Sequence, residues 1–267
     1  MPRAPRITTR NARFQQWHAL LTNRTKRLRA GEFLVQGVRP ITLAVEHGWP
    51  TSALLYAEGR RLSNWARELL DSPAPGERIA MAPELLAELS ERAEGDAEVV
   101  AVVRMPDDDL ARIRVGPSFL GVLFDRPTSP GNLGTLIRSA DAFGADGLVV
   151  TGHAADVYDP KSVRASTGSL FSLPTVRVPS PQEVDDWLAD RGITVIGTDE
   201  HGESALWDTD LTGPVLLLVG NETTGLSNTW RARCDRTVHI PMHGAASSLN
   251  AANAATATLY EAARQRR

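Results

Sequence analysis

Apolar residues in the first 105 positions alternate between helical spacing and short continuous runs. Residues 11–28 carry apolar side chains at helical spacing with Arg and Lys between them, which predicts one basic amphipathic helix. Short strands are expected at 33–35, 53–55 and 99–103, with helices at 40–47, 62–70 and 84–89. This order of elements begins as a βαβ pattern and predicts a small α/β unit.

The rest of the chain alternates strand-sized apolar runs with helical segments. Strands are expected at 119–124, 147–150, 175–178, 193–197, 215–219 and 238–241. Helices are expected at 132–143, 163–170, 181–190, 227–233 and 248–264. Such alternation predicts a parallel sheet covered by helices on both faces, so the fold class is α/β.

A polar connector separates the two patterns. It begins at Pro106, continues through three aspartates and ends at Pro117, a composition typical of a segment that few contacts cross. We therefore expect a first domain at 1–105, a linker at 106–117 and a second domain at 118–267.

The composition, with 42% hydrophobic and 23% charged residues, is that of a globular protein. The basic N-terminus is followed by no apolar segment of signal-peptide type, and the longest apolar runs are strand-sized. We therefore expect a cytoplasmic protein. The single cysteine, Cys234, has no internal partner for a disulfide, and we interpret it as structural.

The charge is unevenly distributed along the chain. Residues 1–39 contain nine Lys and Arg against one acid, a net +8, and since the whole chain carries −3 the remainder carries −11. A basic segment on an acidic body is typical of a protein that contacts phosphates, although a solvated helix face would have the same composition. The candidate RNA-contacting residues are Arg24, Lys26, Arg27, Arg29 and Arg39. Trp17, Trp49 and Trp65 could stack on bases, although core packing is the expected role for most of them.

Three loops that follow predicted strands contain the candidate chemistry, because ligands collect at strand ends in parallel sheets. In the first loop Asn132 stands where a helix N-cap is expected, and Arg138 in the apolar helix that follows would need a carboxylate or phosphate partner. In the second, GNETTG, two glycines bracket Glu222 and allow close backbone approach. The third ends in SSLN and leads into an Ala-rich helix suited to close packing against another helix.

Other cofactor and metal motifs are missing from the sequence. No G-x-G-x-x-G or G-x-x-x-x-G-K-[ST] pattern occurs, which argues against Rossmann and P-loop nucleotide sites. The six histidines have no metal-ligand spacing, so we expect no metal.

The three loops, in this order and spacing, resemble the signature motifs of the SpoU (TrmH) family of RNA ribose 2′-O-methyltransferases over residues 118–262. The segment GEFLVQGVRPITLAVEHG resembles more loosely the substrate-binding domain that many members carry. The resemblance implies a SPOUT-type methyltransferase domain with a C-terminal trefoil knot, S-adenosylmethionine as cofactor, and a homodimer formed through the Ala-rich terminal helix. Such a knot departs from general topology rules and could not be inferred from periodicity.

The resemblance also implies site residues. The implied catalytic residues are Arg138, Asn132, Glu222, Ser248 and Asn250. The implied cofactor-binding residues are Thr198, Leu218, Gly220, Ile240, Met242 and Leu249. An arginine, with a pKa above about 12, is a poor proton acceptor, so we expect Arg138 to contact the RNA phosphate or the developing alkoxide while Asn132, Glu222 and Ser248 position the reacting groups.

The expected function is therefore methyl transfer from S-adenosylmethionine to a ribose 2′-hydroxyl of a structured RNA. A separate basic domain favours a large folded target, and hence 23S ribosomal RNA, with transfer RNA as the alternative. A non-catalytic RNA-binding protein that kept the fold would differ by having no affinity for the cofactor. Both antibiotic resistance and routine ribosome maturation are consistent with the sequence.

Overall fold

The computed structural model describes residues 5–73, 76–91, 97–246 and 248–267. The chain divides into a first unit, Met1–Pro106 with Tyr158–Phe171, and a second unit, Asp107–Val157 with Ser172–Arg267. Two segments differ in membership from the sequence-based boundaries. Residues 158–171 pack in the first unit, and residues 107–117 of the expected linker pack in the second. Within the described ranges no helix has the length and apolar character that a membrane crossing requires.

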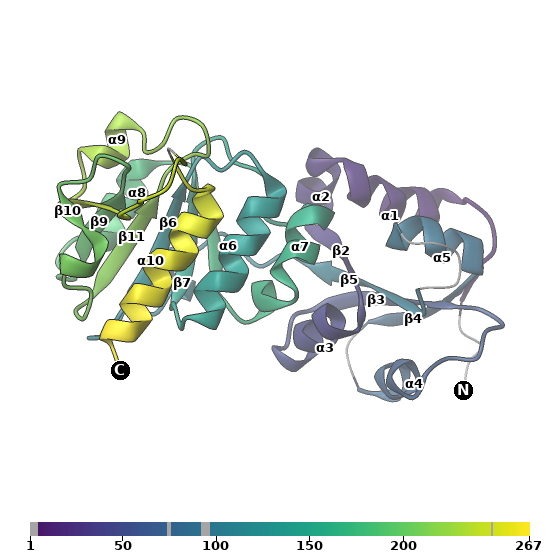
Figure 1. The fold of residues 1–267 in the computed structure, drawn as a ribbon. Coiled ribbons are helices and arrows are strands. Elements are labelled where there is room, and N and C mark those ends of the chain that lie inside the picture. Colours follow the sequence, from purple (N-terminus) through teal and green to yellow (C-terminus); the bar gives the residue numbers. More distant parts are fainter. Residues whose placement is uncertain (1–4, 74–75, 92–96, 247) are drawn as a thin grey trace. The chain divides into compact units, whose positions relative to one another are not determined.

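The first unit is built on a mixed five-stranded sheet in the order β1-β4-β3-β5-β2 (Figure 1). Its strands are β1 (Arg6–Ile7), β2 (Glu32–Gln36), β3 (Thr51–Ala57), β4 (Glu77–Met81) and β5 (Val99–Arg104). Its helices are α1 (Ala12–Thr22), α2 (Arg24–Ala30), α3 (Val38–Glu46), α4 (Asn64–Asp71), α5 (Pro83–Ser90) and α7 (Pro160–Ser166), followed by the 3₁₀ turn η2 (Ser169–Phe171). β5 runs antiparallel to both neighbours, and β1 and β4 were not predicted from the sequence.

The single helix expected at 11–28 is two helices, α1 and α2. Asn23 interrupts it: this residue is both the C-cap of α1 and the N-cap of α2, and its side chain accepts a hydrogen bond from the Lys26 N–H at 3.0 Å. Asparagine competes for backbone hydrogen bonds in this way, which favours a helix boundary over a helix interior.

The segment Tyr158–Phe171 completes the first unit through an aromatic cluster. Phe33 packs on Tyr158 and Phe171 with ring centroids 4.8 and 6.3 Å away, and Trp49 packs on the same phenylalanine. Trp49 is partly buried, and its indole donates to the Phe171 carbonyl at 3.0 Å, so its ring is held by these packing contacts. Trp17 is buried.

Arg27, expected among the RNA-contacting residues, is instead buried, with 2% of its side chain exposed. Its guanidinium donates to the carbonyls of Leu20 and Leu21 at 2.6 and 3.2 Å and pairs with Asp159 at 3.5 Å. A buried arginine needs such partners, and here they join the end of α1 to the segment before α7. Arg27 is therefore a structural residue.

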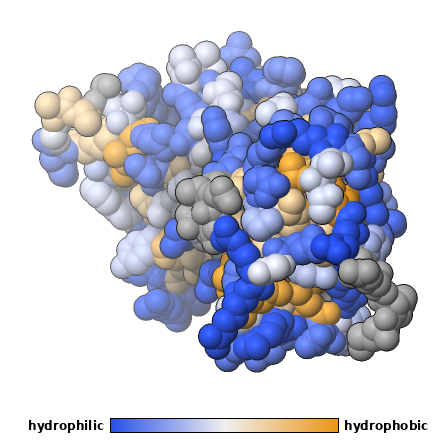
Figure 2. Space-filling model, turned by 90° about the vertical axis from the view of Figure 1, so that its right-hand side faces the viewer, coloured by the Kyte–Doolittle hydropathy of each residue, from blue (hydrophilic) through white to orange (hydrophobic). Residues whose placement is uncertain are grey.

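The face of the molecule drawn in Figure 2 is mostly hydrophilic, with hydrophobic residues in separate patches. Among the described residues of the first unit, Leu28 and Val38 are the large apolar side chains that are exposed. Isolated apolar residues of this kind are ordinary for a soluble surface.

The second unit contains a seven-stranded sheet in which every pair of strands is parallel, as the sequence predicted. The strand order is β10-β12-β9-β11-β6-β7-β8. The strands are β6 (Leu120–Asp125), β7 (Gly147–Thr151), β8 (Thr175–Val178), β9 (Thr194–Thr198), β10 (Ser204–Ala205), β11 (Val215–Val219) and β12 (Arg236–His239). The helices are α6 (Pro130–Ala142), α8 (Pro181–Leu188), α9 (Asn228–Arg231) and α10 (Ala251–Gln265), with 3₁₀ turns η1 (Leu110–Arg112) and η3 (Leu206–Asp208).

The Ala-rich helix α10 packs on α6 of the same chain, and the two lie side by side in Figure 1. Ala252 and Ala255 are buried, and the hydroxyls of Ser139 and Thr256 lie 2.7 Å apart between the helices. Small side chains permit this close approach. Cys234 is half-buried, and burial raises the pKa of its thiol to about 11, in keeping with a structural role.

The substitution Arg27→Ala is expected to lower the free energy of unfolding by about 3 kcal/mol, because it leaves buried carbonyls and Asp159 without their donor. Lys26→Ala, one position earlier and exposed, is the matched control and should change the value by less than about 0.5 kcal/mol. Denaturant unfolding measures both. Equal, small effects of the two substitutions would contradict the structural role of Arg27.

Candidate cofactor cavity and catalytic network

A cavity of about 340 Å³ lies at the carboxyl ends of β9, β11 and β12. Five of the predicted cofactor residues line it: Thr198, Gly220, Ile240, Met242 and Leu249. The sixth, Leu218, does not, because it is buried within β11, where its carbonyl accepts a hydrogen bond from the Thr198 hydroxyl at 2.9 Å. Leu218 therefore supports Thr198, a residue of the cavity wall, without lining the cavity itself.

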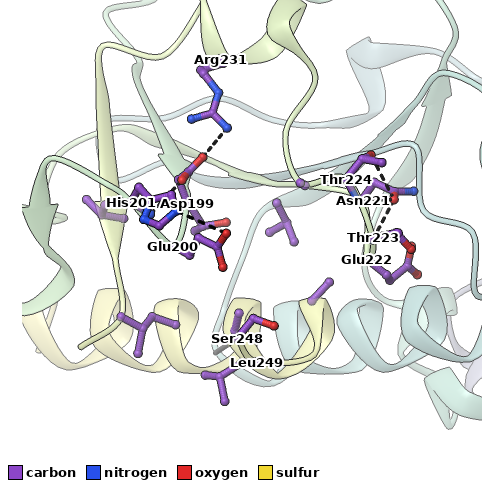
Figure 3. A pocket seen from close by; sticks show the side chains of 18 of the residues that line it. Asp199, Glu200, His201, Asn221, Glu222, Thr223, Thr224, Arg231, Ser248 and Leu249 are labelled. Atoms are coloured by element: carbon purple, nitrogen blue, oxygen red, sulfur yellow. Dashed lines mark hydrogen bonds and ion pairs between the residues drawn. The ribbon is translucent and has the colours of Figure 1, made fainter. Parts of the chain in front are cut away.

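Charged residues that were not predicted from the sequence lie on the side of the cavity opposite the loop that carries Glu222 (Figure 3). Asp199, whose side chain is 8% exposed, pairs with Arg231 at 2.5 Å, and Glu200 and His201 lie beside this pair. Figure 3 shows this group facing the loop that carries Glu222, with Ser248 and Leu249 between them. Asp199 and Glu200 directly follow β9, and ligand-binding residues collect at such strand ends, so both could have been predicted from the sequence. No comparable signal points to Arg231.

The loop after β11 turns back on itself tightly. The N–H of Asn221 donates to the Gly225 carbonyl and the N–H of Gly225 to the Asn221 carbonyl, both at 3.0 Å. A Cβ on Gly220 would lie 2.3 Å from the carbonyl carbon of Gly225, so only glycine fits there. This closure places Glu222, Thr223 and Thr224 at the edge of the cavity.

The Glu222 carboxylate joins the second loop to the first. One oxygen accepts from the N–H and the hydroxyl of Thr128, each at 2.9 Å. The other accepts from the N–H of Ser129 and the side-chain amide of Asn132, both at 3.1 Å. With four donors the carboxylate is fully engaged inside the protein, and it fixes the orientation of Asn132.

Asn132 and Asn250 connect the first loop to the third. The Asn250 amide donates to the Asn132 side-chain oxygen at 3.1 Å, and the Asn250 oxygen caps α10 by accepting from Ala252 N–H at 3.0 Å. Neither asparagine lines the cavity. The N-cap of α6 is Ser129 and not Asn132 as expected, because the helix begins earlier, at Pro130. The side chain of Asn132 is thus left for the contacts with Glu222 and Asn250.

Residues 120–260 match the SpoU rRNA Methylase family, and residues 11–101 match the SpoU L30e-like domain. The chain is 70% identical to a 23S rRNA (uridine(2479)-2′-O)-methyltransferase of Streptomyces viridochromogenes, over 99% of this chain and 94% of that protein. It belongs to the SpoU rRNA Methylase family.

Solved structures agree with this assignment. The SpoU methyltransferase AviRb from Streptomyces viridochromogenes in complex with AdoMet superposes with a TM-score of 0.92 and 70% identity, covering 96% of this chain and 98% of that one. An AdoMet-bound rRNA methyltransferase from Sinorhizobium meliloti superposes with a TM-score of 0.87 at 29% identity, covering 98% of both chains.

The residues of the cavity in this SpoU chain fit S-adenosylmethionine. Glu200 is an exposed carboxylate that suits an ammonium group, and the negative charges of Asp199 and Glu222 favour a positive sulfonium nearby. Arg231 suits a carboxylate. Ile240 and other apolar residues of the lining suit an adenine ring. The volume falls in the range of small-molecule sites.

Arg138 and Ser248, the remaining predicted catalytic residues of the SpoU motifs, differ in position. Ser248 lines the cavity and is exposed. Arg138 lies on α6 with an exposed side chain and does not line the cavity, although its place in an apolar helix predicted a half-buried residue with an anionic partner. Within the described part of the chain it has no ion pair or hydrogen-bond partner from its side chain.

The ionisation of Glu222 is set by two opposing effects. Burial raises its pKa, but the hydrogen bonds from Thr128, Asn132 and Ser129 together outweigh burial, so the pKa lies below its ordinary value of 4.5. Glu222 is therefore an anion near neutral pH. A carboxylate with a lowered pKa and four donors is a weak base, which favours a positioning role.

Because the pKa of Glu222 is lower in the folded protein, its contribution to stability is present above pH 4.5 and disappears as the pH falls through the folded value. Glu222→Gln should therefore be less stable than the wild type at pH 7, and the difference in melting temperature should narrow as the pH falls below 4.5. Glu200→Gln, at an exposed carboxylate of the same cavity, is the control and should track the wild type. A pH-independent difference for Glu222→Gln would contradict the lowered pKa.

Proposed function

We propose that this chain transfers the methyl group of S-adenosylmethionine to the 2′-hydroxyl of a uridine ribose in 23S ribosomal RNA. The observation that carries the proposal is the single network in which Glu222, Asn132 and Asn250 join three strand-end loops beside a cavity of cofactor size. The substrate and the uridine are those in the name of the relative that is 70% identical over nearly the whole chain.

The contacts of the cavity and of the three loops indicate the role of each group. The bound cofactor supplies an electrophilic methyl group, and the cavity residues hold it so that this group faces the acceptor. Glu222 accepts a hydrogen bond from the nitrogen of the Asn132 side-chain amide, and Asn250 donates one to its oxygen. Both ends of the Asn132 side chain are therefore held, and the edge of the cavity is preorganised before RNA binds. Ser248, exposed at the cavity, is free to contact the acceptor ribose.

The proposal is tested with purified protein, S-adenosylmethionine labelled in its methyl group, and 23S rRNA from cells that lack the activity. We expect label in 23S rRNA at one uridine ribose, located by mapping of ribose methylation, and no label in transfer RNA. Arg138→Ala should lower turnover at least about 100-fold. Label in transfer RNA alone would favour the alternative substrate, and cofactor binding without transfer to any RNA would contradict the enzymatic function.

We also propose that the active form is a homodimer in which Arg138 of one copy completes the cavity of the other. Arg138 is exposed on α6, outside the cavity of its own chain, while α10, packed against α6, begins at the cavity with Ala251 and Ala254. A two-fold axis along this helix pair would bring the α6 face of a second copy to the cavity. The exposed aromatic rings of Trp207 and Tyr260 would be covered by the same contact.

Mixing two inactive variants tests this arrangement. Arg138→Ala and Glu222→Gln copies, co-expressed with different tags, should recover roughly a quarter of wild-type activity, because half of the dimers are mixed and each contains one intact site. Each variant alone is the control. A mixture as inactive as its components, or a monomer by light scattering with full activity, would contradict the proposal.

The first unit is the proposed RNA-binding part. Lys26, Arg29 and Arg39 are exposed and available to phosphates, and Arg24 is partly exposed. The C-terminal trefoil knot and the cytoplasmic location expected from the sequence are kept as parts of this proposal. Antibiotic resistance and routine ribosome maturation both stay open as the biological purpose.

A further inference from the structure

Two residues at the end of β6 hold the loop that carries Glu222, although neither of them lines the cavity. Asp125 is the last residue of β6 and is 1% exposed. Arg126 follows it with a backbone φ of 51°, a left-handed conformation that residues other than glycine rarely adopt. A non-glycine residue in this conformation at the edge of a site is a reason to ask what its side chain and backbone hold.

The two side chains form a bidentate pair. Arg126 Nε donates to one carboxylate oxygen of Asp125 and Nη2 donates to the other, both at 3.1 Å. The buried carboxylate also accepts from the N–H of Ser227, the N-cap of α9, at 2.8 Å. The charge of Asp125 is therefore compensated on one side by a guanidinium and used on the other to fix the end of the GNETTG loop.

Arg126 holds the same loop at two more points. Its guanidinium donates to the Gly225 carbonyl at 3.2 Å, and its own carbonyl accepts from the Asn221 side-chain amide at 2.7 Å. The other end of the Asn221 side chain accepts from the N–H groups of Thr223 and Thr224 at 2.9 and 3.1 Å. Arg126 thus holds the loop directly at Asn221 and Gly225, and through Asn221 it also holds Thr223 and Thr224.

The left-handed backbone of Arg126 makes these contacts possible together. Its N–H donates to the Thr151 carbonyl at 3.0 Å while its carbonyl faces Asn221. Gly152, with a φ of 67°, leaves room for the side chain, since a Cβ there would lie 2.6 Å from the Arg126 Cγ. The space for the pair is therefore built by the ends of both β6 and β7.

We propose that Asp125 and Arg126 are positioning residues that set the cofactor-facing wall of the cavity and the place of Glu222 by clamping the loop at Asn221, Gly225 and Ser227. This inference rests on the proposed methyltransferase function. It predicts that loss of the clamp weakens cofactor binding and slows turnover without removing any residue that touches the cofactor.

The test compares variants at Arg126 by calorimetric titration with S-adenosylmethionine and by turnover on 23S rRNA. Arg126→Ala and Arg126→Gly should each weaken cofactor binding and lower kcat by at least about tenfold. Arg126→Gly should melt higher than Arg126→Ala, because glycine accepts the left-handed backbone. Arg126→Lys, which keeps the charge but not the paired donors, should be intermediate.

Two further variants separate positioning from general destabilisation. Arg177→Ala breaks an ion pair with Asp108 elsewhere in the second unit and should leave cofactor affinity unchanged. Asn221→Ala releases the same loop, so the double variant with Arg126→Ala should bind no more weakly than the weaker single variant. Additive losses, or wild-type affinity in Arg126→Ala, would overturn the clamp.

The two proposals fail in different ways. A wild-type protein that binds no S-adenosylmethionine would overturn the proposed function and the clamp with it. A wild-type protein that binds and transfers methyl groups, with Arg126→Ala and Arg126→Gly equal to it, would overturn only the clamp.

Discussion

The site depends on one carboxylate. Glu222 accepts four hydrogen bonds from residues about ninety positions earlier in the chain, and through Asn132 it reaches Asn250 at the start of α10. These residues stand on loops that a parallel sheet brings to one edge. Without Glu222 the donors of Thr128, Ser129 and Asn132 would lose their shared acceptor, and the Asn132 side chain would keep only its contact with Asn250.

Glu222 can join the loops and still carry a negative charge, because its partners are uncharged hydrogen-bond donors and not a cation. The N–H and hydroxyl of Thr128, the N–H of Ser129 and the amide of Asn132 supply the hydrogen bonds. They keep the carboxylate ionised, so the cavity keeps its negative charge. That charge suits a cofactor with a positive sulfonium. On the far side, Asp199 is paired with Arg231, so the charge there is closer to balanced.

Much of this arrangement could be predicted from the sequence. The parallel sheet of the second unit follows from its alternating pattern of strands and helices. The predicted bounds of two strands, 175–178 and 215–219, agree with the structure at both ends, because turn residues on either side limit where each strand can begin and end. Asn132, Glu222 and Asn250 were identified from motifs, but their mutual hydrogen bonds could not be, because register and side-chain direction depend on the fold. Five of the six predicted cofactor residues line the cavity, whereas the side chain of Leu218 is buried within β11 and does not line it.

The errors have physical causes. Periodicity extends across Asn23 and does not register the cap that divides the helix. In the sequence Arg27 cannot be told apart from the other cations of a basic segment. Only the fold shows that it is buried and donates to the carbonyls of Leu20 and Leu21. The segment 158–171 packs in the first unit because its aromatic side chains meet Phe33 and Trp49, a contact between distant parts of the sequence.

A crystal structure of this protein with S-adenosylmethionine would show whether the loop network of Glu222 faces the methyl group. We expect cofactor density in the cavity between the loops after β9, β11 and β12, with the sulfonium methyl directed to the edge where Glu222 and Asn132 meet. Cofactor bound elsewhere, or in this cavity with its methyl group turned toward Asp199 and Arg231, would contradict it.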